Sequence, residues 1–143
     1  MEKNKEAELV RNIFKTMKCI HMELGAVLAK SNIHLSPPQY FILNRVAKEQ
    51  IIQQDLANMM KMDKSSMLRQ VNALQKQMLI ARIPDENDKR KKILVLTQKG
   101  GELFEKAETI ANTFFSGLYE GVSEEDLEPF FRVLNQFKVN SKK

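Results

Sequence analysis

The chain has 143 residues, 43% of them hydrophobic, which is enough for one domain with a real core and too apolar for a disordered chain. Its 23 Lys and Arg residues outnumber 18 Asp and Glu, for a formal net charge of +5. No apolar run approaches the roughly 20 residues that a membrane span requires, so we expect no membrane partner. The single cysteine cannot form an internal disulfide, and the charged start MEKNKEAE is unlike a signal peptide, so we expect a cytoplasmic protein.

Four helices are predicted in the first half of the chain. Apolar residues at spacings of three and four predict a long amphipathic helix over Glu6–Lys30. Ser36, followed by Pro37-Pro38-Gln39, has the pattern of a capping box and starts a second helix that runs to about Lys48. A short third helix spans Gln53–Met60, and Asp63 caps a fourth that ends near Met78. The apolar stripe of the first helix comprises Val10, Ile13, Met17, Ile20, Leu24, Val27 and Leu28.

The fourth helix has one apolar and one polar face. At 100° per residue, Met67, Leu68, Val71, Leu74 and Met78 fall on one side, and Ser65, Arg69, Asn72, Ala73 and Lys76 on the other. Side chains that can donate hydrogen bonds to phosphates or bind base edges gather at its start. They are Lys64, Ser65, Ser66, Arg69 and Gln70. Many surface helices carry such residues without a ligand. Only together with the segment that follows does this helix indicate DNA binding.

That segment is a predicted β-hairpin with a basic tip. Leu79–Ile83 and Ile93–Leu96 are β-rich, and Pro84 is expected to end the first strand. The tip carries four consecutive cations, Lys89, Arg90, Lys91 and Lys92, which suit phosphates or a narrow minor groove. From residue 63 to 92 there are eight basic and four acidic residues (net +4), against one basic and eight acidic from 101 to 131 (net −7). The positive field therefore lies on the middle of the chain, although a solvated charge run remains the simpler alternative for the tip alone.

Two more helices complete the predicted fold. Thr97 can cap a fifth helix, with Leu103, Phe104, Ala107, Ile110, Ala111, Phe114 and Leu118 as its apolar residues. Ser123 can cap a sixth, with Leu127, Phe130, Phe131, Leu134 and Phe137. The predicted fold class is mainly α with a small β-hairpin (α+β), in the order of a winged helix-turn-helix.

Three segments resemble the MarR family of bacterial transcription regulators, namely LSPPQYFIL (35–43), QQDLANMM (53–60) and DENDKRKKILVLTQKG (85–100). The resemblance implies that Asp88 orients Arg90 toward the minor groove, and it adds Asp88 to Arg90, Lys91 and Lys92 as wing residues that act on DNA. It also implies one MarR-like domain over residues 1–143. Within it, 35–100 form the DNA-binding lobe, and 1–34 with 101–143 form a homodimer that reads a pseudo-palindromic, double-stranded operator. Repression is the family default.

Three residues depart from the family pattern. Ile52 stands where a Ser or Thr commonly caps the third helix, and Ala73 replaces a frequent arginine. Met78 replaces the glycine that usually follows the fourth helix. Because a non-glycine residue in the left-handed region costs about 1 kcal/mol or more, we expect Met78 to extend the helix instead.

The signal that controls DNA binding is open at this point. A small-molecule effector could bind between the dimerisation helices and the DNA-binding lobe, where Met17, His21, Met22, Tyr40 and Phe41 offer apolar surface, but no residue is assigned to it. A redox-sensing regulator using Cys19 is an alternative, although we expect this thiol to be packed or partly buried. Cys19 and His21 lie roughly 200° apart around a helix and cannot hold one metal ion, and no cofactor is predicted.

Two other classes of function compete with a regulator. An enzyme is disfavoured because the chain has no Gly-rich phosphate loop, no metal-ligand cluster and no nucleophile beside a base. A nonspecific basic helical scaffold, in which the charged tip serves only solubility, would bind every duplex weakly and without preference. DNA binding with sequence preference separates the regulator from the scaffold.

Overall fold

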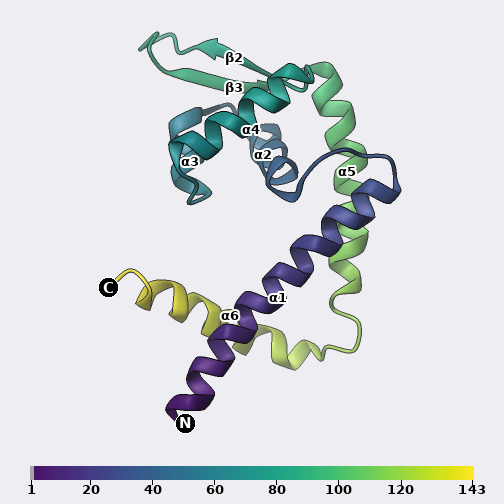
Figure 1. Cartoon of the computed structure of the whole chain (residues 1–143), viewed down its shortest axis with the longest axis vertical. Coiled ribbons are helices and arrows are strands. Elements are labelled where there is room, and N and C mark those ends of the chain that lie inside the picture. The colour runs from purple at the N-terminus through teal and green to yellow at the C-terminus, as the bar shows by residue number, and fades with distance from the viewer. Residues whose placement is uncertain (1) are drawn as a thin grey trace. The chain divides into compact units, whose positions relative to one another are not determined.

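The computed structural model describes residues 2–143, which form helices and a small antiparallel sheet, so the predicted α+β class is confirmed (Figure 1). The elements are α1 (Lys3–Lys30), α2 (Pro37–Lys48), β1 (Ile51–Ile52), α3 (Gln53–Met59), α4 (Lys64–Lys76), β2 (Ile80–Pro84), β3 (Lys92–Leu96), α5 (Gln98–Gly117) and α6 (Glu124–Asn140). Across this described range, no helix combines the length and apolarity needed to cross a bilayer.

Two compact units make up the chain, and their boundary falls within α5. The first unit ends at Asn112 and the second is Thr113–Lys143. The first contains α1 to α4, the sheet and most of α5, and it holds the hydrophobic core. Side chains that are at most 1% exposed there are Leu24, Leu28, Ile42, Leu43, Leu56, Met67, Val71, Leu74, Leu79, Ile80, Leu94, Ala107 and Ala111.

Local side-chain caps start most of these helices, as predicted. The Gln39 backbone N–H donates to Ser36 Oγ (3.3 Å) and the Ser36 N–H donates to Gln39 Oε1 (3.1 Å), which completes the capping box of α2. Ser123 Oγ accepts the Glu125 N–H at 3.3 Å. Before α5, Thr97 Oγ1 accepts the Gly100 N–H at 2.9 Å. At Ile52 no side chain caps α3, in agreement with the departure noted above.

The sheet has the order β1-β3-β2, with every pair antiparallel. Its two-residue strand β1 was not predicted, and Ile51 of this strand pairs with Leu94 of β3. The first strand ends at Pro84, as expected, and Pro84 itself forms the last pair of the ladder, with Lys92. Since β2 is an edge strand, a proline at its last position sacrifices no hydrogen bond that the sheet requires.

Two expectations for Met78 were wrong, namely that it extends α4 and that it packs on the buried face of this helix. The helix ends at Lys76, and Met78 adopts φ +63°, so it takes the left-handed position and does not extend the helix. The Leu79 N–H donates to the Leu74 carbonyl (3.0 Å) and the Met78 N–H to the Gln75 carbonyl (2.9 Å), which is a Schellman motif. Met78 is 68% exposed and Leu68 is 47% exposed, so neither packs with the buried face as predicted.

Replacing Met78 with glycine is expected to raise the free energy of unfolding by about 1 kcal/mol, because glycine removes the left-handed strain at an exposed position. Urea denaturation followed by circular dichroism measures the change. Gln77→Gly is the matched control, since Gln77 has an ordinary φ of −81° and gains only unfolded-state entropy, which destabilises the protein. A loss of stability in both variants would contradict the claim that Met78 is strained.

The junction between α4 and α5 is held by three consecutive backbone carbonyls. Lys99 Nζ donates to Gln77 O (3.1 Å), Thr97 Oγ1 donates to Met78 O (2.6 Å), and the Thr97 N–H donates to Leu79 O (3.2 Å). Gly100 is buried against the same segment, and a Cβ placed there would lie 1.9 Å from Leu79 O. The first turn of α5 thus rests directly on the chain that joins α4 to β2.

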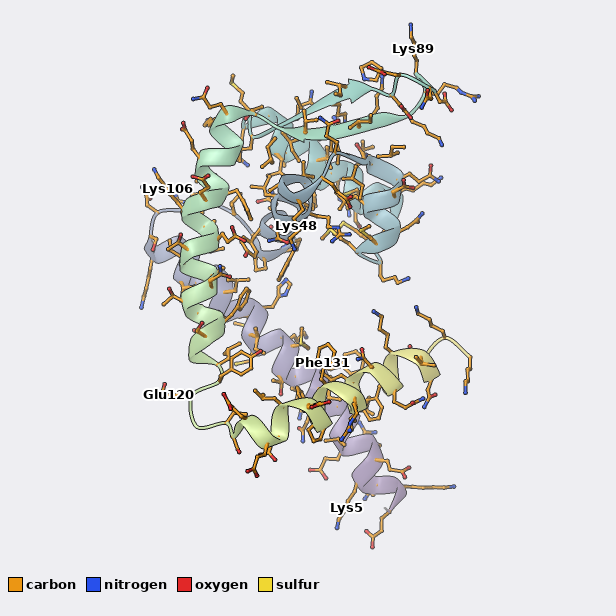
Figure 2. The ribbon with its side chains drawn as sticks, turned by 180° about the vertical axis from the view of Figure 1, so that it is seen from behind. Lys5, Lys48, Lys89, Lys106, Glu120 and Phe131 are labelled. Carbon is orange, nitrogen blue, oxygen red and sulfur yellow. The ribbon has the colours of Figure 1, made fainter. Side chains whose placement is uncertain are left out.

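Helices at both ends of the chain expose apolar side chains. Of the stripe predicted on α1, only Leu24 and Leu28 are buried, and Met17 is 56% exposed. Outside the stripe, Phe14 and Met22 on the same helix are more than 70% exposed. In the second unit α6 buries none of its side chains, and Phe131 is 65% exposed (labelled in Figure 2). Exposed apolar side chains of this extent are typical of interaction surfaces.

Candidate nucleic-acid interface

The first turn of α4 presents a connected polar cluster. The Asp63 carboxylate accepts the Ser66 N–H (2.8 Å) and the Ser66 hydroxyl (2.9 Å), and Arg69 Nη2 donates to Ser66 Oγ (3.1 Å). The hydrogen bond from the Ser66 backbone is the main reason that the pKa of Asp63 lies below its ordinary value. Lys64, Ser65 and Arg69 are exposed, and Ser66 and Gln70 are half-buried. The buried residues Met67, Val71 and Leu74 anchor the opposite face of the helix.

The hairpin loop between β2 and β3 is closed by its own backbone. The Asp85 N–H donates to Lys91 O (3.0 Å) and the Lys91 N–H to Asp88 O (2.9 Å). Lys89 lies at the tip, beyond the helices of the first unit (Figure 2). Lys89, Arg90, Lys91 and Lys92 are all exposed, as predicted for a basic tip.

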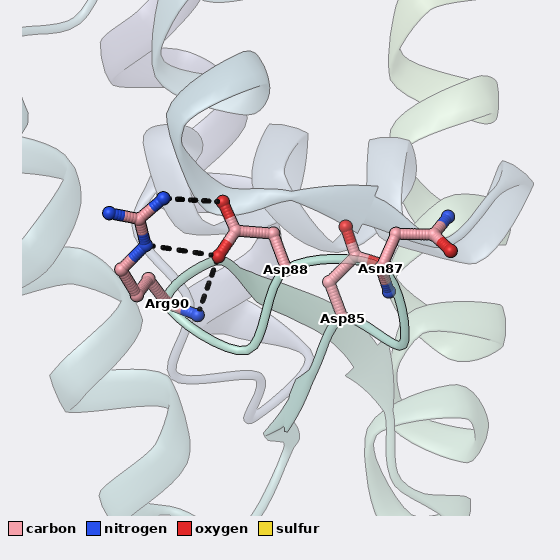
Figure 3. A network of polar contacts seen from close by, with 4 residues as sticks. All are labelled: Asp85, Asn87, Asp88 and Arg90. Carbon is pink, nitrogen blue, oxygen red and sulfur yellow. Dashed lines mark hydrogen bonds and ion pairs between the residues drawn. The ribbon is translucent and has the colours of Figure 1, made fainter.

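Within this loop the carboxylates of Asp85 and Asp88 accept hydrogen bonds from the loop itself, while the four cations are exposed. The Asp85 carboxylate accepts the Asn87 N–H (3.2 Å), and Asp88 Oδ1 accepts the Arg90 N–H (3.1 Å). Arg90 Nε also contacts Asp88 Oδ1 at 3.2 Å (Figure 3). This side-chain hydrogen bond is the main cause of the lowered pKa of Asp88. The Arg90 side chain is 92% exposed against 32% for Asp88, so the carboxylate orients a guanidinium that remains available to a ligand.

A third polar cluster joins the hairpin to two helices, and its central residue was not predicted. Arg82 of β2 donates through Nε to Gln53 Oε1 (3.0 Å) and through Nη2 to Asn72 Oδ1 (2.7 Å). Its Nη1 donates to Gln75 Oε1. Burial lowers the pKa of the guanidinium, which stays charged. The sequence signal was an arginine inside the apolar run LIARI, read there only as part of a strand.

An open cavity of about 540 Å³ lies in the first unit, on the surface shared by α1, α2 and the end of α3. Two of the five residues expected to offer apolar surface to an effector pocket, His21 and Phe41, line it. Arg45 also lines it, and its Nε is buried without a hydrogen-bond partner among the described residues. The complete lining is His21, Pro38, Phe41, Asn44, Arg45, Met59, Met60 and Met62. The Nη2 atom of Arg45 pairs with Glu49 Oε1 at 3.5 Å, so within this guanidinium the ion pair leaves Nε without a partner in the described chain.

Cys19 is exposed on α1 in the single chain, so the expectation of a packed or partly buried thiol was wrong. The helix turns this position away from Leu24 and Leu28, which carry the buried part of α1. No group of three or more His, Cys, Asp or Glu side chains in residues 2–143 is arranged to hold a metal ion.

Comparison with known proteins places the lobe just described in a family. The model of the MarR family matches residues 35–92. The HTH-type transcriptional regulator BilQ of Clostridium symbiosum is 31% identical over 97 residues, which cover 68% of this chain and 67% of BilQ. The uncharacterized HTH-type transcriptional regulator YybA of Bacillus subtilis is 28% identical over 110 residues, which cover 76% of this chain and 73% of YybA.

The same fold occurs in a solved complex with DNA. The crystal structure of a cysteine-to-serine mutant of MarR from E. coli, complexed with operator DNA, has a TM-score of 0.84 and 18% sequence identity. The match covers 94% of this chain and 96% of that one.

Proposed function

The chain belongs to the MarR family of transcription regulators, and from this premise we propose that it represses transcription by binding a pseudo-palindromic operator as a homodimer. It is a regulator and not an enzyme. The observation that carries the proposal is the wing, where Asp88 holds a 92% exposed Arg90 among further lysines. The protein would act in the cytoplasm, where a bacterial chromosome lies.

Residues 35–100 form the DNA-binding lobe in this proposal. The start of α4 enters the major groove, where Ser65, Ser66, Arg69 and Gln70 meet base edges and Lys64 meets phosphate. Arg90 enters the minor groove, and Lys91 and Lys92 bind the flanking phosphates. The DNA-bound relative from E. coli supports this use of the fold.

The homodimer would form through residues 1–34 and 101–143. The exposed apolar side chains of α1 and α6 support this, since Phe14 is 71% and Phe131 is 65% exposed in the single chain. Two α4 helices about 34 Å apart would then meet successive major grooves on one face of the DNA.

An effector would act on this arrangement from the cavity that His21, Phe41 and Arg45 line. We propose an aromatic carboxylate, because its ring would pack on Phe41 and the methionines and its carboxylate would accept a hydrogen bond from Arg45 Nε, which the ion pair with Glu49 leaves without a partner in residues 2–143. Because the lining comes from α1 as well as from α2 and α3, a ligand there would change the position of α2 and α3 relative to α1.

The function is tested by a salt titration of binding to DNA from directly upstream of the protein's own coding region, with a scrambled duplex of equal length as the control. We expect a preference of about three decades or more, with one dimer bound per site. Equal, weak and steeply salt-dependent binding to both duplexes would support the basic scaffold instead. Selection from a random-sequence duplex library distinguishes that outcome from a wrongly chosen operator.

A further inference from the structure

Arg82 makes three side-chain hydrogen bonds, more than any other arginine of residues 2–143, and none of them goes to a carboxylate. Arg45 pairs with Glu49 and Arg90 with Asp88, whereas all three partners of Arg82 are side-chain amides. Gln53 is the first residue of α3, Asn72 and Gln75 are one turn apart on α4, and Arg82 is in the middle of β2. The guanidinium therefore ties the wing to both helices of the helix-turn-helix.

The chemistry of the guanidinium sets the orientation of all three amides. An arginine has only N–H donors, so each amide must turn its oxygen toward Arg82 and its NH₂ group away. Within residues 2–143, no acceptor takes a hydrogen bond from the three NH₂ groups. Without the guanidinium, each amide could rotate by about 180° and offer an acceptor in place of a donor.

Asn72 lies on the face of α4 that the proposed function assigns to DNA, so the orientation of its amide affects which bases it can bind. It is exposed and lies seven residues after Ser65 and three after Arg69, on the helix face that carries both. Asn72 thus extends the surface that the proposed function assigns to the major groove. A donor at this position favours an acceptor on the DNA, such as guanine O6 or N7 or thymine O4, and disfavours the amino groups of adenine and cytosine.

We propose that Arg82 is a positioning residue for DNA sequence preference, which fixes the amides of Gln53, Asn72 and Gln75 so that they present N–H donors to the operator. This inference rests on the proposed function and adds to it a residue that touches no DNA. Arg82 acts through the amides, because each of its three nitrogens donates to an amide oxygen and only two N–H groups of a half-buried side chain are left for a phosphate.

The first experiment needs no DNA. Heteronuclear NMR of the free protein compares the side-chain NH₂ groups of Asn72 and Gln75 in the wild type and in Arg82→Met, which keeps the apolar stem and removes the guanidinium. Both groups should be ordered in the wild type and should average to the behaviour of a free amide in the variant. Asn58, exposed on α3, should be unchanged. Identical Asn72 and Gln75 signals in the two proteins would overturn the proposal, whatever the fate of the proposed function.

The second experiment measures base preference. Wild type, Arg82→Met and Lys48→Met each select from a random-sequence duplex library, followed by a salt titration on the duplex that wild type selects. Lys48→Met is the matched control, since it removes one positive charge from an exposed position of the same lobe. We expect Arg82→Met to lose preference at one or two positions per half-site and to bind about 3- to 10-fold more weakly, with the salt slope unchanged.

Three results of these measurements decide whether Arg82 has a positioning role. A salt slope lowered by about one would show that Arg82 itself binds phosphate and would overturn the positioning role. An unchanged base preference in Arg82→Met, with wild type selecting a clear site, would overturn it as well and leave the proposed function standing. If Arg82→Met has no further effect in an Asn72→Ala background, the two residues act as a unit, as the proposal requires.

Discussion

Replacing Gly100 with alanine is expected to lower the free energy of unfolding by about 3 kcal/mol, the upper end of the usual cost of overpacking. The added Cβ would lie 1.9 Å from the Leu79 carbonyl oxygen and 2.8 Å from its carbon, both of them backbone atoms. No side-chain rotation relieves such a contact. To accept it, the first turn of α5 must move away from Leu79, with loss of the 3.2 Å hydrogen bond from the Thr97 N–H. Urea denaturation measures the loss.

Gly101→Ala is the matched control, one residue further along the same helix. A Cβ at Gly101 meets nothing within 4 Å, so alanine should stabilise α5 by up to about 1 kcal/mol through its better helix propensity. The two variants are thus expected to differ in sign. Equal effects would contradict the close packing of α5 on Leu79.

Replacing Arg90 with alanine is expected to weaken operator binding by about 10- to 100-fold, which corresponds to roughly 1–3 kcal/mol, and to reduce the salt slope by about one. Its side chain is 92% exposed, and Asp88 contacts the guanidinium at 3.2 Å. Folding should be unaffected, because the side chain packs on no core residue. A fluorescence anisotropy titration at several salt concentrations gives both quantities.

The control for Arg90→Ala separates orientation from charge. Asp88→Asn weakens the hold on Arg90 and makes the wing more positive, so it should lower the preference for operator over scrambled DNA while raising affinity for both at low salt. A solvated charge run would behave differently, since each added positive charge would then strengthen operator and scrambled DNA alike, with no change in preference.

The predictions that succeeded depend on short-range patterns. Ser36 with Gln39, Asp63 and Ser123 cap helices through bonds that span two or three residues, so a few neighbouring letters suffice to identify them. The turn of the wing is equally local, because Asp88 contacts a side chain two residues away. Periodicity located the core of α4 for the same reason.

The predictions that failed depend on what distant segments require. Met78 takes a strained left-handed conformation because the chain must turn there for β2 to pair with β3, and tertiary pairing overrides local preference. The role of Arg82 was invisible because its partners are 7 to 29 residues away in the chain. Exposure of Cys19, likewise, depends on which side of α1 the rest of the unit covers.

The three carbonyls of Gln77, Met78 and Leu79 make the end of α4 and the start of α5 mechanically inseparable. Each accepts a hydrogen bond from Thr97 or Lys99, and at Gly100 the two segments are so close that no side chain fits between them. We therefore expect a tilt of the first turn of α5 to move the last turn of α4 and the base of the wing with it. This junction should therefore be rigid. If the DNA-binding helices change orientation, we expect the hinge to lie further along α5 or at the ends of α1.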